Sequence, residues 1–380
     1  MNKLVASLFI VSLGMNAPAT AQSGKEIMYV GTYSVRGSEG IYVFEFDRKA
    51  GTMQKLQSVS NAKSPSFLAV HPSGNYLYSV NEAAETGPGK AGAVSSYAVD
   101  KATGKLNFLN TQSSLGSGPC HISIDQTGKT AFVSNYGGGS LAVLPIKADG
   151  TLGAATDSVQ NSGTGPNTQR QEKAHVHSAI VAPDNRFVYV SDLGTDKLYI
   201  FETDVKAGTV KPAQKPYVTV KPGSGPRHFT FHPNGKHAYL VEELTSSVAV
   251  FSRDAKTGTL TLLDDGVKTL PTDFIGQNTS ADIHIDPSGK FLYQSNRGRN
   301  ALAIFAIGID GKLTKVGDQL TEGKTPRNFL IDPRGEFVFV ANQDTDDITI
   351  FRRDAKTGKL TYTGQSVKVP APVCVIMANR

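Results

Sequence analysis

Short apolar runs alternate with turns rich in Gly, Pro and Asn along almost the whole chain. The stretch from Gly223 to Phe251 predicts strands at 227–231, 237–241 and 247–251, with a Pro-Asn-Gly turn between the first two. Pro fixes φ and Gly supplies a positive φ where two apolar runs reverse direction, so this turn favours a hairpin. No long stretch has the 3.6-residue period of an amphipathic helix, and we therefore expect almost no helix.

The same pattern occurs six times. The copies begin at Ser64, Gly118, His175, Gly225, Ser280 and Thr325. Each is followed by a third apolar run, a polar hairpin and a fourth run. Neighbouring copies start roughly 45–60 residues apart, the period of a four-stranded propeller blade.

A seventh copy is divided between the two ends of the sequence. Ala371–Asn379 matches a first strand, and the segments starting at Ile27 and Gly40, with the hairpin and run after them, match strands two to four. The pattern predicts an all-β fold, a seven-bladed β-propeller with four antiparallel strands per blade. Its ring is closed by pairing of the C-terminal strand with the N-terminal sheet.

The first residues have the pattern of a secretory signal peptide. One early Lys precedes an apolar run from Leu4 to Leu13, and Ala19-Thr20-Ala21 is a small-x-small cleavage site. We expect a signal peptide at 1–21 and a single propeller domain at 22–380. The protein is predicted to be exported, to the periplasm or the outside. No later segment is apolar for long enough to cross a membrane, and no membrane association is expected.

The net charge indicates which partners to expect, and the cysteine positions indicate whether a disulfide can form. The net charge is +6, with lysines scattered through hairpins rather than gathered in a stripe, so nucleic acid is not an expected partner. Cys120 and Cys374 fall in first strands of non-adjacent blades, too far apart for a disulfide, and two free buried thiols are predicted. We expect a monomer that binds a small molecule.

Chemistry in a propeller concentrates where the first strands enter the central channel. The residues expected there are Phe67, His121, His177, Arg227, His228, Asp282, Arg327 and Asn328, and beside them lie second-strand ends such as Asn81-Glu82, Asn135-Tyr136 and Glu242-Glu243. Recurring polar groups in apolar repeats indicate a shared polar cavity. For Asn and Asp, the alternative is that they satisfy backbone groups at strand ends.

The other histidines lie in turns, in strands or at the end of one long connection. His71, His232 and His237 belong to turns or strand starts, and His284 is expected in the core. His175 and His177 form an H-x-H pair, but no third ligand at fixed spacing accompanies them, so neither metal nor cofactor is expected. The unusually long connection 162–178 carries Arg170 and is expected to fold over the channel mouth.

Several motifs together resemble one family. They are GPRH at Gly225, the run ending H-x-H at His177, NYGGGS at Asn135, DLGTD at Asp192, SNRG at Ser295 and ANQDTDD at Ala341. In this order they resemble the lactonase family of seven-bladed propellers, typified by bacterial 6-phosphogluconolactonase, with carboxymuconate-lactonising enzymes among its fungal relatives. One departure is Glu242, where the family has Asn; Glu243 keeps the family's carboxylate, and Glu242 is expected to add a charge that affects the substrate.

The resemblance implies hydrolysis of a lactone ring, and from the residues we expect direct attack of water without a metal. His177, His228 and Glu243 are candidate bases, and Arg227 completes the predicted catalytic set because a guanidinium stabilises an oxyanion. The substrate-binding residues are predicted to be Arg170, His121, Arg297, Arg327, Asn135 and Asp282. No Gly-x-Ser-x-Gly motif supports a serine nucleophile.

The expected location raises a question about the substrate. A phosphorylated sugar lactone belongs to the cytoplasm, so an exported relative is expected to open unphosphorylated aldonolactones or another external lactone. Two alternatives stay open. One is an exported binding or scaffold propeller, which predicts no convergent His, Arg and Glu side chains. The other is a muconate-type lactonising cycloisomerase.

Overall fold

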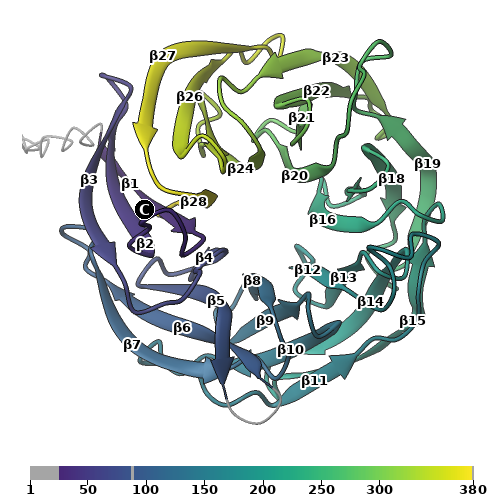
Figure 1. The fold of residues 1–380 in the computed structure, drawn as a ribbon. Coiled ribbons are helices and arrows are strands. Elements are labelled where there is room, and N and C mark those ends of the chain that lie inside the picture. Colours follow the sequence, from purple (N-terminus) through teal and green to yellow (C-terminus); the bar gives the residue numbers. More distant parts are fainter. Residues whose placement is uncertain (1–24, 87–89, 379–380) are drawn as a thin grey trace, which may run out of the picture.

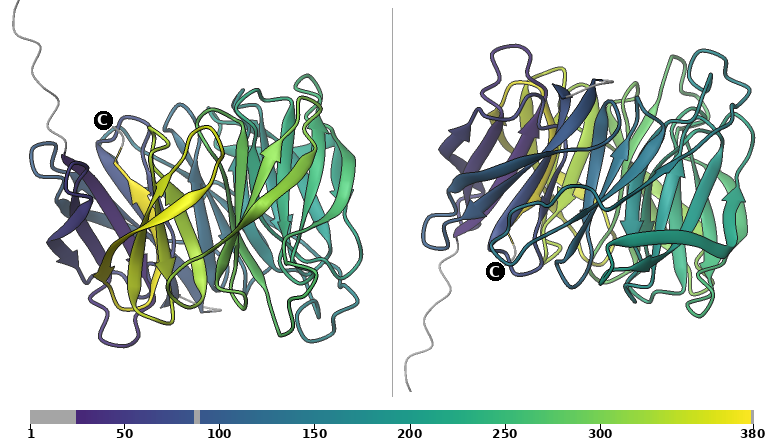
Figure 2. Two further views of the ribbon diagram at one scale, coloured as in Figure 1. Left: turned by 90° about the horizontal axis from the view of Figure 1, so that it is seen from above. Right: turned by 90° about the horizontal axis from the view of Figure 1, so that it is seen from below.

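Seven blades surround one axis in the structure, a computed structural model that describes residues 25–86 and 90–378 (Figure 1). Each blade is a four-stranded antiparallel sheet. Turned by 90°, the ring is a thick disc with loops at both ends of its axis (Figure 2). No residue of the two described ranges is helical. The predicted all-β propeller is therefore confirmed, whereas the predicted signal peptide lies outside the described residues.

Six blades are continuous in sequence, and the innermost strand of each comes first. Blade 1 consists of β4 (Leu68–Val70), β5 (Tyr76–Thr86), β6 (Ala91–Val99) and β7 (Leu106–Ser113). Blade 2 consists of β8 (Pro119–Ile124), β9 (Thr130–Asn135), β10 (Ser140–Pro145) and β11 (Asp157–Gln160). Blade 3 consists of β12 (Val176–Val181), β13 (Phe187–Asp192), β14 (Lys197–Asp204) and β15 (Thr209–Thr219). Blade 4 consists of β16 (Pro226–Phe231), β17 (His237–Glu242), β18 (Ser247–Arg253) and β19 (Leu260–Lys268). Blade 5 consists of β20 (Ser280–Ile285), β21 (Phe291–Asn296), β22 (Ala301–Ile307) and β23 (Leu313–Leu320). Blade 6 consists of β24 (Pro326–Ile331), β25 (Phe337–Asn342), β26 (Asp347–Arg353) and β27 (Leu360–Lys368).

Blade 7 joins the two ends of the chain. It contains β28 (Pro372–Met377), β1 (Lys25–Thr32), β2 (Ile41–Asp47) and β3 (Thr52–Val59), in that order from the axis outward. The C-terminal strand β28 pairs antiparallel with β1, with Met377 opposite Met28 (Figure 1). The predicted ring closure is thus confirmed. It removes the free edge that an open ring would leave between its first and last sheets.

The core lies between blades, since each sheet packs both of its faces on neighbours. At the junction of blades 6 and 7, Phe46 packs edge-on against Phe337 and Phe339, with ring centroids 5.1 and 4.8 Å apart. All three side chains are buried. Burial of apolar area stabilises the fold by about 25 cal/mol per Å², which explains why second strands such as Phe337–Asn342 are apolar on both faces.

A repeated hydrogen bond fixes the spacing of the blades. A buried Tyr in the second strand donates its hydroxyl to a Gly carbonyl in the outer hairpin of the next blade, because a buried hydroxyl needs a partner. The pairs are Tyr29–Gly104, Tyr78–Gly150, Tyr189–Gly258, Tyr239–Gly311 and Tyr293–Gly358, at 2.6–3.1 Å. Phe occupies this position in β9 and β25, at Phe132 and Phe339.

Both cysteines are free and buried, as predicted. Cys120 lies in β8 and Cys374 in β28, with blade 1 between them. Burial raises the pKa of both thiols, so neither has the character of a reactive thiolate. Across residues 25–86 and 90–378, the structure contains no helix with the length and apolar character needed to span a membrane.

Candidate active site

β-bulges in the first strands turn two successive side chains toward the axis. In an ordinary strand neighbouring side chains point to opposite faces, but a bulge re-aims one of them. In β16 the register shifts between Pro226 and Phe229, so that Arg227 and His228 both line the central cavity. Comparable shifts occur near the starts of β8, β12, β20 and β24.

The repeat defines three sets of equivalent positions, or layers, around one end of the channel. The mouth layer contains the residues four positions after the repeated Tyr or Phe: Tyr33, Glu82, Tyr136, Leu193, Glu243, Arg297 and Gln343. The second layer contains the positions equivalent to Arg227, and the third layer the residue after each: Ser66, Cys120, His177, Arg227, Ala281, Arg327 and Val373, then Phe67, His121, Ser178, His228, Asp282, Asn328 and Cys374. Nine of these residues line the central cavity: Ser66, Phe67, Glu82, Cys120, His177, Arg227, His228, Arg327 and Val373.

Glu243 is the centre of a buried charge cluster on one side of the channel. Its Oε2 lies 3.0 Å from Arg227 Nε, and its Oε1 lies 2.7 Å from Arg170 Nη2 and 3.0 Å from Arg297 Nη2. The Glu243 side chain is 3% exposed. Although burial raises its pKa, Arg297, Arg227 and Arg170 together lower the pKa of Glu243 to about 2. This carboxylate is therefore a weak base that holds three cations in place.

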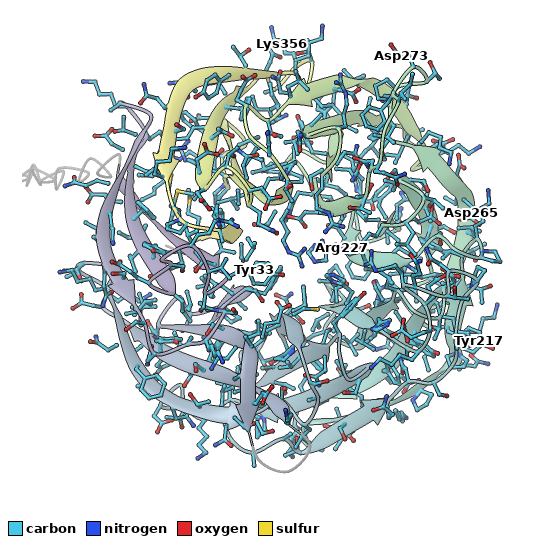
Figure 3. The ribbon with its side chains drawn as sticks, in the orientation of Figure 1. Tyr33, Tyr217, Arg227, Asp265, Asp273 and Lys356 are labelled. Atoms are coloured by element: carbon cyan, nitrogen blue, oxygen red, sulfur yellow. The ribbon has the colours of Figure 1, made fainter. Side chains whose placement is uncertain are left out.

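Arg227 is the most deeply buried of these cations. Its Nη1 donates to the Ala281 carbonyl at 2.5 Å, and its side chain is 2% exposed. Burial, Arg327 and Arg297 lower the pKa of Arg227 to about 9. A guanidinium crowded by like charges gains stabilisation from any new anion beside it, so this position suits a developing oxyanion. In Figure 3, Arg227 and Tyr33 lie on opposite sides of the ring, both beside the central opening.

His228, the residue after Arg227, forms a hydrogen-bonded pair with Asp282 of the next blade. His228 Nδ1 is 2.7 Å from Asp282 Oδ1, and Asn328 Nδ2 donates to Asp282 Oδ2 at 2.6 Å. Burial and Arg227 lower the pKa of His228 to about 4, so the imidazole is neutral at pH 7. With Nδ1–H donated to the carboxylate, the lone pair lies on Nε2, as a general base requires.

His284 differs from its prediction as a core residue. Its Nε2 lies 2.9 Å from Asp282 Oδ2, and its side chain is 38% exposed. Two residues beyond Asp282 on β20, it faces the same way as Asp282 because side chains alternate along a strand. His284 therefore belongs to the polar channel, on the side of Asp282 away from the mouth.

His177 and His121 complete the aromatic wall of the channel. The rings of His177 and His121 lie 5.4 and 5.6 Å from that of His228, and His121 lies 4.3 Å from Phe67. Burial and the positive charge of Arg227 hold the pKa of His177 well below its ordinary value, and burial together with His228 does the same for His121. Both imidazoles are therefore neutral hydrogen-bonding groups at pH 7.

Glu82 and Arg327 lie on the blade 1 and blade 6 side of the same cavity. Ser66 Oγ donates to Glu82 Oε2, and the Arg327 guanidinium lies 5.3 Å from the centre of the Tyr33 ring. Burial raises the pKa of Glu82, and this effect outweighs the opposing influence of Arg327 and Ser66. Burial likewise raises the pKa of Tyr33. Glu82 was expected beside the channel but was given no catalytic or binding role, although it occupies the same repeat position as Glu243. Tyr33 was not predicted at the site.

The long connection 162–178 brings Arg170 to the mouth. Besides Glu243, Arg170 Nη2 contacts the Tyr136 hydroxyl at 3.3 Å. The next residue, Gln171, anchors the loop, since its buried amide donates to Leu193 O and Asp196 Oδ1, each at 2.8 Å. The predicted position of this loop over the mouth is confirmed.

His175, at the end of the same loop, contacts residues of the loop and of the mouth. Its ring stacks on Tyr136 at 4.5 Å, and its Nε2 lies 3.0 Å from Glu172 Oε1. Across residues 25–86 and 90–378, no group of three or more His, Cys, Asp or Glu side chains is placed to hold a metal ion.

Asn135, predicted to bind substrate, lies outside the channel cluster. Its Nδ2 donates to Ser114 O at 2.9 Å and to Ser140 Oγ at 3.1 Å, and the residue is fully buried. Asn135 stands one residue before the mouth layer, and its side chain points into the blade. The same register places six further residues in blade interiors: Thr32, Asn81, Asp192, Glu242, Asn296 and Asn342, all buried.

Glu242 shares this structural register, which corrects the expectation that its charge reaches the substrate. Ser247 Oγ donates to Glu242 Oε2 at 2.6 Å. Burial, with a contribution from Asp265, raises the pKa of Glu242 to about 7. A protonated carboxyl has one donor and one acceptor oxygen, so it resembles the amide that Asn provides at this position in β9, β21 and β25.

The central cavity is small, and many of its lining side chains are polar or charged. Its lining includes Glu82, His177, Arg227, His228 and Arg327. It encloses about 10 Å³, which is room for about one water molecule. A polar cavity of this size, between the neutral His228 imidazole and several guanidinium groups, suits a single activated water molecule rather than a whole substrate.

Comparison with known proteins identifies the family. The family model "Lactonase, 7-bladed beta-propeller" matches residues 27–377. The chain belongs to the lactonase family. It is 36% identical over 352 residues to a 6-phosphogluconolactonase of Bacillus subtilis, covering 92% of this chain and 98% of that one. It is 39% identical to a 6-phosphogluconolactonase of Formosa agariphila, covering 90% of this chain and 96% of the relative.

A solved structure shows the same architecture. The periplasmic gluconolactonase of Pseudomonas aeruginosa superposes with a TM-score of 0.87 at 34% identity, covering 93% of this chain and 99% of that one. The resemblance predicted from the motifs is therefore confirmed. The convergent Arg, His and Glu side chains also count against the scaffold alternative, which predicted no such cluster.

Proposed function

We propose that this lactonase-family protein hydrolyses unphosphorylated aldonolactones by direct attack of water. The observation that carries the proposal is the Glu243-centred arginine cluster beside the His228–Asp282 pair, with Arg227 and His228 lining the same cavity. Ester-type hydrolysis needs a base for the water and a cationic site for the oxyanion. Arg227 supplies the cationic site and His228 supplies the base, and the two residues are adjacent in β16.

His228 is assigned as the general base. The water molecule in the cavity gives its proton to Nε2, and Asp282 stabilises the imidazolium that forms through its 2.7 Å contact with Nδ1. Glu243 is excluded from this role because its pKa of about 2 leaves it little basicity. Its part is to position Arg227 and Arg297.

The arginines are assigned to the developing oxyanion and the substrate. Arg227 faces the cavity and receives the negative charge of the tetrahedral intermediate, while Arg297 and Arg170 approach Glu243 from the mouth. His177, His121 and Arg327 line the channel and supply further polar contacts. The lactone ring itself binds at the mouth, since the cavity below has room for about one water molecule.

The choice of an unphosphorylated substrate rests on location. The leader pattern at 1–21 supports export, and the Pseudomonas aeruginosa relative is a periplasmic gluconolactonase. An exported protein meets unphosphorylated sugar lactones rather than the phosphorylated intermediate of the cytoplasm. The proposal includes action as a monomer in the periplasm or outside the cell.

A parallel assay tests this function. Acid release by the purified protein is measured on gluconolactone, on its 6-phosphate and on a muconate-derived lactone, and the spontaneous rate is subtracted. We expect the highest kcat/KM on gluconolactone. Asp282→Asn should lower kcat by roughly 10²–10⁴-fold, because His228 then loses its orientation and its counter-charge. A preference for the 6-phosphate would contradict the substrate assignment, and an unchanged Asp282→Asn variant would contradict the base.

A further inference from the structure

Two glutamates occupy equivalent positions on opposite sides of the channel mouth. Glu82 lies within β5 of blade 1, and Glu243 follows β17 in blade 4, each four residues after the repeated Tyr of its second strand. Blades 2 and 3 separate them on one side of the ring and blades 5 to 7 on the other. The repeat therefore places the two carboxyl groups across the channel from one another.

Their surroundings make them chemically different. Glu243 Oε1 and Oε2 lie within 3.0 Å of three arginines, whereas Glu82 accepts a hydrogen bond from the neutral Ser66 hydroxyl. The group that influences Glu82 most, after burial itself, is Arg327. One carboxyl is thus fixed as an anion, while the other retains a proton more readily. Of the two carboxyl groups, Glu82 is therefore the one suited to act as an acid.

Glu82 also lines the cavity that holds the proposed base. Its neighbours in that lining are Arg227, His228, Arg327 and His177. A group within this cavity can exchange a proton with a substrate at the mouth. Among the groups already assigned, the His228 imidazolium is the one donor for a second proton transfer, and it lies beside the attacking water.

This second proton transfer is to the leaving ring oxygen of the lactone. Water attacks the carbonyl carbon, His228 takes one proton, and the carbonyl electron pair moves to oxygen near Arg227. When the tetrahedral intermediate collapses, the bond between the carbonyl carbon and the ring oxygen breaks and its electron pair goes to the ring oxygen. That alkoxide is strongly basic and needs a proton as it departs.

We propose that Glu82 is the general acid that donates this proton to the leaving ring oxygen. The products are the acid and its new hydroxyl group, with Glu82 left as a carboxylate. The proton taken up by His228 then returns to Glu82 directly or through solvent, so that the overall reaction adds one water molecule to the lactone. This assignment rests on the proposed lactone hydrolysis.

Glu82→Gln tests the assignment with two lactones of different leaving groups. The ring oxygen of gluconolactone leaves as an alkoxide, whereas that of dihydrocoumarin leaves as a phenoxide, which is less basic and needs far less protonation. We expect Glu82→Gln to lower kcat on gluconolactone by roughly 10²–10³-fold and to change kcat on dihydrocoumarin by less than about threefold. Activity on the aryl lactone would also show that the variant is folded.

Glu85→Gln is the matched control. Glu85 lies on the same strand, its side chain is 63% exposed, and it pairs with Lys90 at 3.5 Å. Its substitution should leave both rates unchanged. Where the wild-type protein does not accept dihydrocoumarin, the pH profile on gluconolactone decides. The alkaline fall in kcat, which reports loss of the acid's proton, should be absent in Glu82→Gln.

The outcomes separate this inference from the proposed function. Full activity of Glu82→Gln on gluconolactone, equal losses on both lactones, or an unchanged alkaline limb would each overturn the role of Glu82 while leaving lactone hydrolysis intact. A wild-type protein that opens neither lactone would overturn the proposed function, and the general-acid role with it.

Discussion

At the scale of single residues, position within the repeat decides what a polar side chain does. Asn135 and Tyr136 are neighbours in sequence, yet Asn135 binds Ser114 and Ser140 inside the blade, while Tyr136 meets Arg170 at the mouth. Successive side chains on a strand point to opposite faces, so a shift of one residue separates a structural group from a channel group.

Glu242 gives a prediction about stability and pH. Its pKa is about 7 in the folded protein, against about 4.3 for an unperturbed Glu. Between these values the folded state holds a proton that the unfolded chain has released, so the free energy of unfolding decreases as pH rises through this range and is constant above it. Glu242→Gln, which stays neutral, should remove this decrease and make the protein more stable at pH 8 by on the order of 2 kcal/mol.

Urea unfolding at pH 5 and pH 8 measures the effect as the difference between variant and wild type. Glu202→Gln is the control, because Glu202 is 41% exposed and pairs with Lys211 on the surface. Parallel stability curves for Glu242→Gln and wild type would show that Glu242 is ionised in the folded protein and contradict this account.

At the scale of elements, the connection 162–178 is a fixed part of the mouth. Gln171 is fully buried and ties the loop to Leu193 and Asp196, while the Arg170 side chain is 38% exposed above Glu243. The loop thus presents a cation at the place where a substrate must enter.

Arg170→Ala should raise KM several-fold and lower kcat less, because Arg227 and Arg297 continue to hold Glu243. Steady-state kinetics on gluconolactone separates the two constants. Gln169→Ala is the neighbouring control, since Gln169 is exposed and its side chain should not affect either constant. A fall in kcat as large as that in kcat/KM would instead place Arg170 in the transition state.

The inner strands show what the sequence can and cannot reveal about an element. The repeat predicted strands at 227–231 and 237–241, and the structure has them at Pro226–Phe231 and His237–Glu242. It did not predict the bulges that let Arg227 and His228 face the same cavity, because a bulge depends on how a strand pairs with its neighbour. The partnership of His228 with Asp282 of the next blade likewise needed the three-dimensional arrangement.

At the scale of the whole molecule, the ring depends on every junction between blades. Five junctions have the Tyr-to-Gly hydrogen bond, and the junction of blades 6 and 7 has Phe339 in that place. There Arg48 of blade 7 forms ion pairs with Asp332 at 2.6 Å and Glu336 at 2.7 Å, both from blade 6. Arg253 and Arg353 form similar ion pairs, with Asp184 and Asp286, across two junctions that do have the Tyr hydrogen bond. The ion pair is therefore a recurring contact between blades, and at the junction of blades 6 and 7 it occurs without the hydroxyl.

Arg48→Ala should therefore destabilise the protein by roughly 3 kcal/mol, since it leaves the fully buried Asp332 carboxylate without its cation. Urea or thermal unfolding measures the loss. Arg352→Ala is the matched control, because Arg352 is exposed and contacts the face of Phe337 at 4.6 Å, a contact worth less than about 1 kcal/mol. Equal stability losses in the two variants would contradict a special role for the Arg48 ion pairs at this junction.

The sequence alone determined the architecture and the family of this protein. Its repeated pattern of apolar strands and Gly-containing turns specified seven blades and the pairing of the chain ends, since hydrophobic period and turn chemistry are local properties. Its motifs indicated a lactonase and most of the residues at the channel.

Only the tertiary structure decided which of those residues act together and in which protonation state. Asn135 and Glu242 turned into the blades, Asp282 became the partner of His228, and Glu82 and Glu243 acquired opposite surroundings. These outcomes depend on burial and on charges contributed by different blades. Such distances exist only once the ring has closed, which is why no pattern along the chain contains them.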